Sequence, residues 1–339
     1  MFEPPRCPNR RCPRHVDACP ARFLRHGHYL AKCRPHPIPR FRCPTCRRTF
    51  SRQTFRMDYR DHRPDLNARL FRWLSSGVGL RQCSRNLRLS LRCTELKFRK
   101  IARHLRQLNL NLRGPLPSDA SFQLDEIETY ETQRNARPLS VPILIETNTR
   151  FVVWAESAPI RPRGKMTLSR RRRIKKDEAR FGRRRDRSRR SLRRTLARAA
   201  VLVVGRGRIH LDTDQKSSYP HLAREAFGGD RLVHTQTNSR LARTVANPLF
   251  PINHTEAMAR DLSGRLRRES WLVSKKRRFL DLGLQIFLAY RNYVRRRFNR
   301  DEESPAQFLG FAPRRLSETE MLGWRQDWGV RSLHPLTVA

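Results

Sequence analysis

Apolar side chains recur at helical spacing in the first third of the chain. Leu66, Leu70 and Leu74 share one face of a predicted helix, which ends where Gly77-Val-Gly-Leu80 interrupts the pattern. Two more helices follow, separated by a short turn. The three predicted helices cover residues 66–74, 81–87 and 91–106. A short helix, a tight turn and a longer third helix form the layout of a helix-turn-helix.

Beyond residue 120 the apolar positions gather into strand-like runs bounded by turn residues. The first three runs are separated by short polar turns, which favours antiparallel pairing. Later strands alternate with helices, and two long helices close this part. The predicted strands cover 121–130, 139–147, 151–157, 208–214 and 232–234, and the predicted helices begin near 188 and cover 219–227, 254–270 and 275–298. This order is typical of a mixed α/β sheet of the ribonuclease H-like kind.

Cysteines are concentrated near the start of the chain, where four of them form two close pairs. The four are Cys7 and Cys12, and Cys43 and Cys46. Two such pairs joined by β-like segments can place four thiolates around one tetrahedral ion, so they predict a zinc ribbon with a structural zinc. A redox pair, or cysteines that only fill space, are the alternatives. Cys19 and Cys33 have irregular spacing, and we expect them not to be ligands.

Together these patterns predict a multidomain α/β protein. Two prolines and a glycine between Arg113 and Asp119 indicate a linker. The predicted parts are a zinc ribbon at 1–60, a helix-turn-helix domain at 64–112, a linker at 113–120, a ribonuclease H-like domain at 121–300 with an arginine-rich insert at 161–198, and a C-terminal tail at 301–339.

The charge of the chain narrows the choice of partner. Lys and Arg number 74 against 30 Asp and Glu, which gives a net charge of +44. A charge this large repels itself unless a polyanion neutralises it, so it points to nucleic acid rather than to a small neutral ligand. The densest run, in the insert 161–198, is either a solvated or disordered face or a segment that orders on a phosphate backbone.

The third predicted helix is basic and supplies the candidates for DNA contact. If it enters a DNA groove, the side chains that face the bases are Arg92, Thr94, Glu95, Lys97 and Arg99. A plain three-helix structural bundle is the competing interpretation. The basic third helix and the preceding cysteine pairs favour DNA binding.

Hydropathy gives no sign of a membrane protein. No apolar run approaches the roughly 18–20 residues that span a bilayer, and the first residues lack the order of a signal peptide. We therefore expect a cytoplasmic protein associated with the nucleoid. Cysteines are reduced in that compartment, which favours metal ligation over disulfides.

Acidic residues are few, and some fall at informative positions. Asp125 lies on the first predicted strand, Asp214 ends the fourth with Asp212 on the same face, and Glu256 lies near the start of a closing helix. Three carboxylates that converge at one edge of a sheet form a hard-oxygen site suited to two Mg²⁺ or Mn²⁺ ions, which can cleave phosphodiesters. The alternative is that each acid forms an ordinary salt bridge with a neighbouring arginine.

Taken in order, several stretches of the chain resemble the DDE transposases of bacterial insertion sequences. These stretches are Cys7-Pro-Asn-Arg-Arg-Cys12, Arg40-Phe-Arg-Cys-Pro-Thr-Cys46, Gly79-Leu-Arg-Gln-Cys-Ser-Arg-Asn-Leu87, Leu124-Asp-Glu-Ile-Glu-Thr-Tyr130, Thr213-Asp-Gln-Lys-Ser-Ser-Tyr-Pro220, Asn253-His-Thr-Glu256 and Ser304-Pro-Ala-Gln-Phe-Leu-Gly310. The resemblance implies that Asp125, Asp214 and Glu256 carry the metal ions, with Asp214 preferred to Asp212.

The resemblance also implies a function. The zinc ribbon and helix-turn-helix would recognise double-stranded DNA at the element ends, and the carboxylate site would cleave and join strands, with the protein acting as a homo-oligomer on DNA. A non-catalytic DNA-binding protein, either a regulator or a decayed transposase, is the alternative. An RNA-binding protein is a weaker third interpretation, because it explains the charge but not the spacing of the carboxylates.

Overall fold

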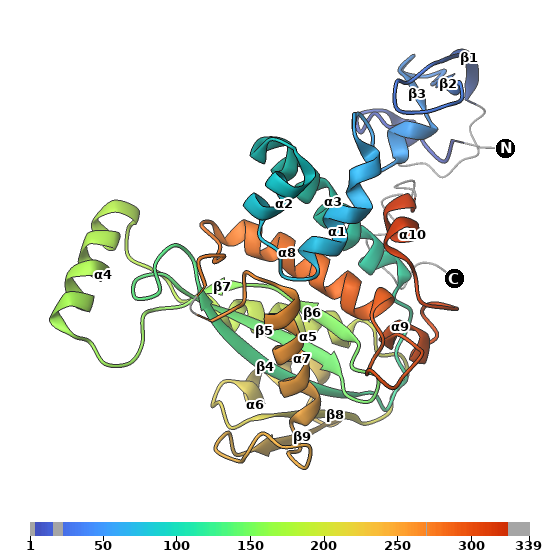
Figure 1. Cartoon of the computed structure of the whole chain (residues 1–339). Coiled ribbons are helices and arrows are strands. Elements are labelled where there is room, and N and C mark those ends of the chain that lie inside the picture. The colour runs from blue at the N-terminus through green and yellow to red at the C-terminus, as the bar shows by residue number, and fades with distance from the viewer. Residues whose placement is uncertain (1–3, 16–22, 269, 325–339) are drawn as a thin grey trace.

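The computed structural model describes residues 4–15, 23–268 and 270–324. It has a small N-terminal sheet, a group of helices beside it, and a larger mixed α/β part (Figure 1). The predicted multidomain α/β class with a mixed sheet is therefore confirmed. Within the described ranges, no helix has both the length and the apolar character needed to cross a membrane.

The N-terminal sheet has three short antiparallel strands in the order β1-β2-β3. They are β1 (Leu24–Tyr29), β2 (Ile38–Arg42) and β3 (Thr49–Ser51), followed by a 3₁₀ turn at Arg52–Phe55. Phe41, Phe50 and Phe55 form a small buried core together with the cysteines. The Phe50 and Phe55 rings meet edge to face, with centroids 5.9 Å apart. A hydrophobic core this small rarely stabilises a domain by itself, and small domains of this kind are often stabilised by a bound metal ion.

The helical part matches the predicted helices. It consists of α1 (Asn67–Leu74), α2 (Leu80–Leu87) and α3 (Leu91–Leu112). Arg88 ends α2 in the left-handed conformation with φ 52°, and the Ser90 side chain caps α3 by accepting from the Cys93 N–H. The third helix continues six residues past the predicted end because Leu108 and Leu110 are also buried.

The larger sheet has the strand order β6-β5-β4-β8-β9, with a short strand β7 paired to β5. The strands are β4 (Ser121–Tyr130), β5 (Pro138–Glu146), β6 (Val152–Ala155), β7 (Ala158–Pro159), β8 (Ile209–Asp214) and β9 (Leu232–Thr237). Strands β4, β5 and β6 pair antiparallel, whereas β8 is parallel to both β4 and β9. The third predicted strand, 151–157, is thus only partly correct, since it ends at Ala155 and the chain turns into β7.

Helices cover both faces of this sheet. On one side lie α5 (Ser188–Ala200) and α6 (Tyr219–Phe227), and on the other α7 (Phe250–Leu262) and α8 (Arg277–Ala289). Alternation along β4 explains the two faces: Phe122 stacks on Phe227 of α6, whereas the Gln123 side chain accepts from the Ile252 N–H of α7. Asp125 therefore lies on the α7 side.

The two closing helices differ from their predicted bounds of 254–270 and 275–298. Pro251 lies in the first turn of α7, so the helix begins before His254. It ends at Leu262 because Gly264 passes against the Gly77 loop: a β-carbon on Gly264 would lie 2.5 Å from the Gly77 carbonyl oxygen. Helix α8 continues into the π-helical turn η4 (Tyr290–Val294) rather than to residue 298.

The segment predicted to be a linker, 113–120, connects α3 to β4 and is anchored to the core at Leu116. Leu116 is buried, its N–H donates to the Leu202 carbonyl at 2.7 Å, and its carbonyl accepts from the Val204 N–H. The two prolines on either side of it, Pro115 and Pro117, are exposed. The α3 end and the start of β4 are consequently held together.

The arginine-rich insert has two different halves. Its first half forms α4 (Leu168–Phe181), which projects from the body and has no buried residue (Figure 1). Its second half forms α5, whose Leu192, Leu196 and Ala199 are buried against the sheet, while Arg189, Arg190, Arg193 and Arg194 are exposed. This half is therefore an ordered helix that keeps its arginines on a solvated face.

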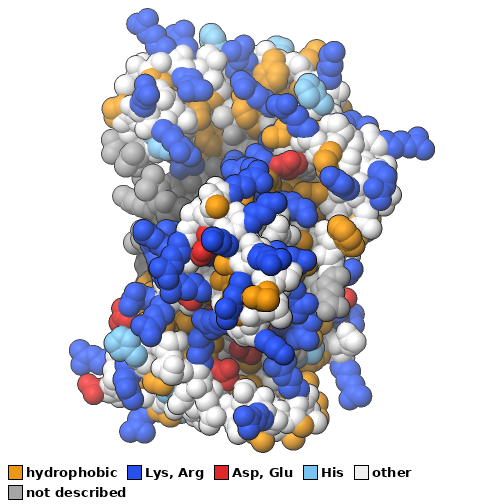
Figure 2. Space-filling view, turned by 90° about the vertical axis from the view of Figure 1, so that its left-hand side faces the viewer, with side chains coloured by type: hydrophobic (Ala, Val, Ile, Leu, Met, Phe, Trp, Pro, Cys, Tyr) orange, Lys and Arg blue, Asp and Glu red, His pale blue; other side chains and the backbone are white. Residues whose placement is uncertain are grey.

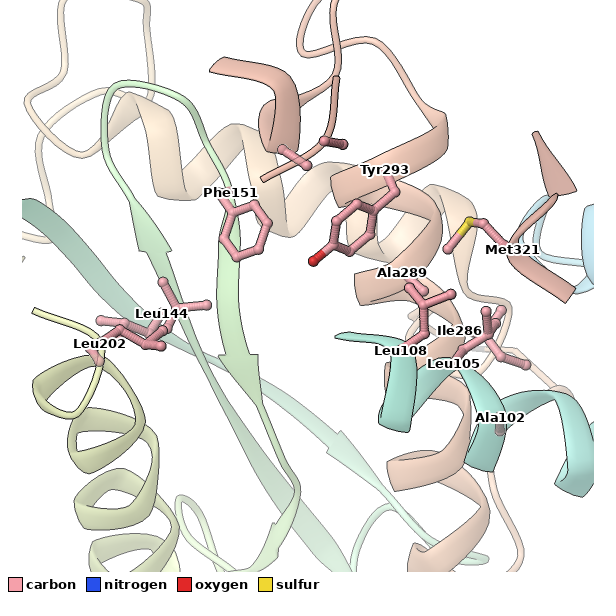
Figure 3. Close-up of a cluster of buried hydrophobic side chains, with 14 of the residues drawn as sticks. Ala102, Leu105, Leu108, Leu144, Phe151, Leu202, Ile286, Ala289, Tyr293 and Met321 are labelled. Carbon is pink, nitrogen blue, oxygen red and sulfur yellow. The ribbon is translucent and has the colours of Figure 1, made fainter. Parts of the chain in front are cut away.

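The described part of the C-terminal tail packs against the helical part. It contains α9 (Pro305–Phe308) and α10 (Glu318–Gly323). The buried His104 ring on α3 hydrogen-bonds the Met321 carbonyl at 2.7 Å. Figure 3 shows Met321 near Leu105, Ile286 and Ala289, in a cluster that also includes Phe151 of the β5–β6 turn. This cluster joins the helical part, the tail and the sheet.

Candidate functional site

The four paired cysteines form a compact cluster. The Sγ atoms of Cys7, Cys12, Cys43 and Cys46 all lie within 4.8 Å of one another. The two pairs interleave, since Cys7 Sγ lies 3.5 Å from Cys46 Sγ and Cys12 Sγ lies 3.8 Å from Cys43 Sγ. Four thiols from two hairpin-like turns around one point can hold a metal ion such as zinc.

The surroundings of the cluster fit this role. Burial raises the pKa of the Cys7 and Cys12 thiols, so four thiolates at this point need a cation to offset their charge. The His15 ring contacts the Cys7 carbonyl at 2.7 Å and is not among the clustered ligands. Cys33 is exposed and lies outside the cluster, as expected, while Cys19 falls outside the described residues.

The three predicted carboxylates line one cavity of about 770 Å³. Asp125 and Asp214 come from adjacent parallel strands: Leu124 pairs with Thr213 in the register, which places the next residue of each strand side by side. Glu256 comes from α7, where it shares the sheet-facing side with Ile252 and Ala259. Two strands and one helix thus bring together residues more than 130 positions apart in the sequence.

The negative charges of these carboxylates have few hydrogen-bond or ion-pair partners in the described structure. Glu256 is 2% exposed, and its Oε1 has no hydrogen-bond partner, while Oε2 accepts from Arg260 at 3.3 Å. Burial and the neighbouring Asp125 raise the pKa of Glu256, and burial together with Asp214 raises that of Asp125. Enclosed acids that repel one another favour a bound cation.

The spacing of the carboxylates differs from that of the thiols. Among the residues that the structure describes, the cysteine cluster is the one group of three or more His, Cys, Asp or Glu side chains whose ligand atoms lie this close together. The oxygens of Asp125, Asp214 and Glu256 are thus more widely spread around their cavity.

Asp212 has a different environment from Asp214. It lies beside Gln123 in the sheet register and accepts a long hydrogen bond of 3.4 Å from the Gln123 Nε2. It does not line the cavity, whereas Asp214 does. Of the two aspartates, Asp214 is the one placed to act with Asp125.

Arginines surround the cavity that the acids line. They are Arg134, Arg161, Arg163, Arg170, Arg243, Arg260, Arg267 and Arg268. Arg170 belongs to the projecting helix α4, so this helix reaches the cavity mouth. Figure 2, which looks onto the α4 side, shows Lys and Arg spread over this face with few Asp and Glu. An acidic centre inside a basic rim can bind cations and, around them, a polyanion.

Sequence reasoning missed a polar network beside the acids. Glu126, next to Asp125, accepts from the Lys216 ammonium and from the Tyr219 hydroxyl, the latter at 3.1 Å. The Lys216 N–H in turn donates to the Asp214 carboxylate at 3.0 Å. The network ties the end of β8 to β4, and it depends on the register between these strands, which the sequence alone does not give.

The predicted DNA-contact residues on α3 fall into two groups. Arg92 is exposed, and Arg99 is half-buried, paired with Glu95 and lying over the Phe279 ring at 5.0 Å. Thr94 is fully buried, and its hydroxyl donates to the Ser90 carbonyl.

Lys97 is also buried, and its ammonium bonds both Asp61 oxygens at 2.6 Å. The prediction that Thr94 and Lys97 face DNA was wrong, because helical spacing does not reveal which face the neighbouring elements cover.

Comparison with known proteins identifies no family for the chain. No protein-family model matches the chain, and no curated protein matches it. What is established is a multidomain α/β protein with a four-cysteine cluster that can hold a metal. The chemistry of the cavity has to be argued from its own residues.

Proposed function

We propose that this protein is a DNA transposase that cleaves and joins strands at a two-metal carboxylate site. The observation that carries the proposal is the cavity where Asp125, Asp214 and Glu256 meet inside a rim of arginines. Ordinary salt bridges explain these acids less well, since Glu256 keeps a buried oxygen without a partner although arginines line the same cavity.

The topology supports a ribonuclease H-like assignment for residues 121–300. In such a sheet the first and fourth strands of the domain lie side by side. Strands β4 and β8 have this relation when the two-residue β7, which lies off the main strand order, is left out. They are parallel and carry Asp125 and Asp214 at neighbouring positions. The helix that carries the third acid, α7, packs on the same face.

The residues present fit divalent cations with oxygen ligands. Three carboxylates form the hard donor set that Mg²⁺ and Mn²⁺ prefer. Two ions about 3.5–4 Å apart need ligands spread more widely than one ion does, which agrees with carboxylates less tightly gathered than the four thiols. When bound, such ions activate a water or a 3′-hydroxyl and stabilise the leaving oxygen of a phosphodiester.

The remaining parts of the chain fit a DNA substrate. The arginines of the rim would hold strand phosphates beside the acids. A second arginine-rich groove lies between α3, α5 and α8 and offers further backbone contacts through Arg103, Arg106, Arg190, Arg194, Arg277 and Arg278. With zinc in the cysteine cluster, the N-terminal part would be a zinc ribbon, and Arg92 on α3 is available for base or backbone contact.

Strand cleavage tests the proposal. The full-length protein is incubated with Mg²⁺ or Mn²⁺ and DNA that carries the inverted repeats flanking its gene. We expect nicking at the repeat ends and a loss of more than about 100-fold in Asp125→Asn, Asp214→Asn and Glu256→Gln, since even outer-sphere changes at metal sites cost roughly 10–100-fold.

Asp212→Asn is the matched control, because it neutralises an aspartate on the same strand and face that does not line the cavity. It should nick as the wild type does. If Asp125→Asn and Asp214→Asn nick at the wild-type rate, the carboxylate site is not catalytic and the proposal fails.

A non-catalytic DNA-binding protein is the second candidate. The second arginine-lined groove, between α3, α5 and α8, favours it, because arginines can bind a phosphate backbone without any metal. This function predicts DNA binding that weakens steeply with salt and no metal-dependent cleavage of any repeat substrate.

A further inference from the structure

A second cavity, of about 460 Å³, lies on another side of α7. Its wall consists of His254 and Met258 of α7 and of the segment 295–301 that follows η4. It shares no lining residue with the carboxylate cavity. Arg295, Arg296, Arg297 and Arg300 line it, against one acid, Asp301.

Arg150 lies behind the wall of this cavity with its charge unsatisfied. Its guanidinium lies 4.0 Å from the centroid of Phe298, a wall residue, and 5.2 Å from that of Phe250. The side chain is only 7% exposed, and Nη1 is buried without a hydrogen-bond partner among the described residues. Ring contacts offset part of the cost of burying this cation but leave the Nη1 donors unused.

Arg291 adds a second buried guanidinium. It is fully buried and donates to the Arg296 and Arg297 carbonyls, which holds the wall segment in place, while its Nε has no partner in the described structure. Burial and the nearby charges of Arg295, Arg150 and Arg297 lower the pKa of Arg291 to about 9. These arginines therefore lie close enough to repel one another.

The two nearby carboxylates offset only part of this charge. Glu302 pairs with Arg296 at 2.7 Å. Asp301 accepts from the Arg297 Nε at 2.8 Å and from the Phe298 N–H at 3.1 Å. Two carboxylates thus stand against five guanidinium groups, those of Arg150, Arg291, Arg295, Arg296 and Arg297. Buried cations without enough counter-charge are costly, so the arrangement favours a bound anion.

We propose that this cavity binds a phosphate group through Arg295 and the other arginines of its wall, with the buried charge of Arg150 behind them adding to the attraction. The planar fork of arginine matches phosphate oxygens, and charge-assisted hydrogen bonds of this kind are strong. The cavity volume falls in the range of small-ligand sites, so it admits a phosphate with its attached group. The source is either a phosphodiester of a DNA strand or free inorganic phosphate. The site does not depend on cleavage at the carboxylate cavity.

Calorimetric titration of the full-length protein with inorganic phosphate, at constant ionic strength set with chloride, tests the site. We expect one phosphate per chain in the wild type. Arg295→Ala should weaken binding by about 10-fold or more, the equivalent of one charge-assisted hydrogen bond. Arg150→Gln should weaken it by a smaller factor, because it removes a nearby charge and no direct contact. Arg295→Lys, which keeps the charge, should recover part of the affinity.

Arg206→Ala is the matched control, because Arg206 is exposed and lines neither cavity. Far-ultraviolet circular dichroism checks that each variant is folded, and the half-buried Arg295 is the safer position to change.

A second arm of the experiment separates the two sources. Saturating duplex DNA abolishes phosphate binding if a backbone phosphate occupies the site, and leaves it unchanged if the ligand is free phosphate; either result supports a phosphate site. The proposal is overturned if the folded wild type binds no phosphate, or if Arg295→Ala and Arg150→Gln bind phosphate as tightly as the wild type.

Discussion

The buried ion pair between Lys97 and Asp61 gives the sharpest test of how α3 is used. Lys97 is 4% exposed, and its ammonium contacts both Asp61 oxygens, the Arg63 carbonyl at 2.7 Å and the Asn67 Oδ1 at 2.9 Å. The Asp61 side chain is 8% exposed. Lys97→Met leaves the Asp61 charge enclosed without its partner, so we expect a loss of about 3–5 kcal/mol in the free energy of unfolding.

Urea unfolding followed by circular dichroism measures this loss, and the double variant Lys97→Met/Asp61→Asn tests its cause. Removing the uncompensated charge should recover roughly half of the lost free energy, because the remaining polar groups need only neutral hydrogen bonds. DNA affinity of whatever fraction stays folded should be close to that of the wild type.

The opposite result would refute the reasoning. If Lys97→Met is as stable as the wild type and loses DNA affinity instead, Lys97 faces DNA and the burial of this side of α3 is wrong. A loss of stability that the double variant does not reduce would show that packing, rather than the enclosed charge, sets the cost.

Three further predictions concern other parts of the chain. Metal analysis should find about one zinc per chain, and the double variant Cys43→Ser/Cys46→Ser should lose it and destabilise the N-terminal sheet. Burial lowers the pKa of His104 from 6.5 to about 4. The neutral ring therefore stabilises the fold fully above pH 6.5, and roughly 3 kcal/mol is lost as the pH falls from 6.5 towards 4. Chemical unfolding at several pH values should show this decline, and His104→Leu should flatten it. Arg92→Ala should reduce the salt dependence of DNA binding by about 0.9 in log–log slope without changing stability, whereas an unchanged slope would exclude a phosphate contact there.

The sequence predicts best those elements whose pattern is local. The alternation of β4 and the proline-started α6 fall at their predicted bounds, and the spacing of the cysteine pairs indicates their cluster. Each of these features depends on neighbours in the chain, such as a strand period or two cysteines in one turn.

The features that the sequence did not predict depend on contacts between elements that lie far apart in the chain. Thr94 and Lys97 were predicted to be exposed and to face a DNA groove. The helix pattern alone does not show that Lys97 pairs with Asp61, because Asp61 lies 36 positions earlier in the chain. Helix α7 ends early since Gly264 packs against a loop nearly 190 residues before it. The acids Asp125, Asp214 and Glu256 could be chosen from their scarcity and context, but the Lys216–Glu126 pair beside them could not, because it depends on the register between β4 and β8.

The 22-residue helix α3 sets a length scale for the proposed activity. At 1.5 Å per residue it spans about 33 Å, close to ten base pairs of duplex DNA. One end carries the exposed Arg92, and the other leads through the anchored segment 113–120 directly into β4 and Asp125. Because one face of the helix packs against α8, the helix is held as a rigid spacer. A transposase built this way would cut at a fixed offset from the sequence it reads, and the helix rather than a flexible tether would set that offset.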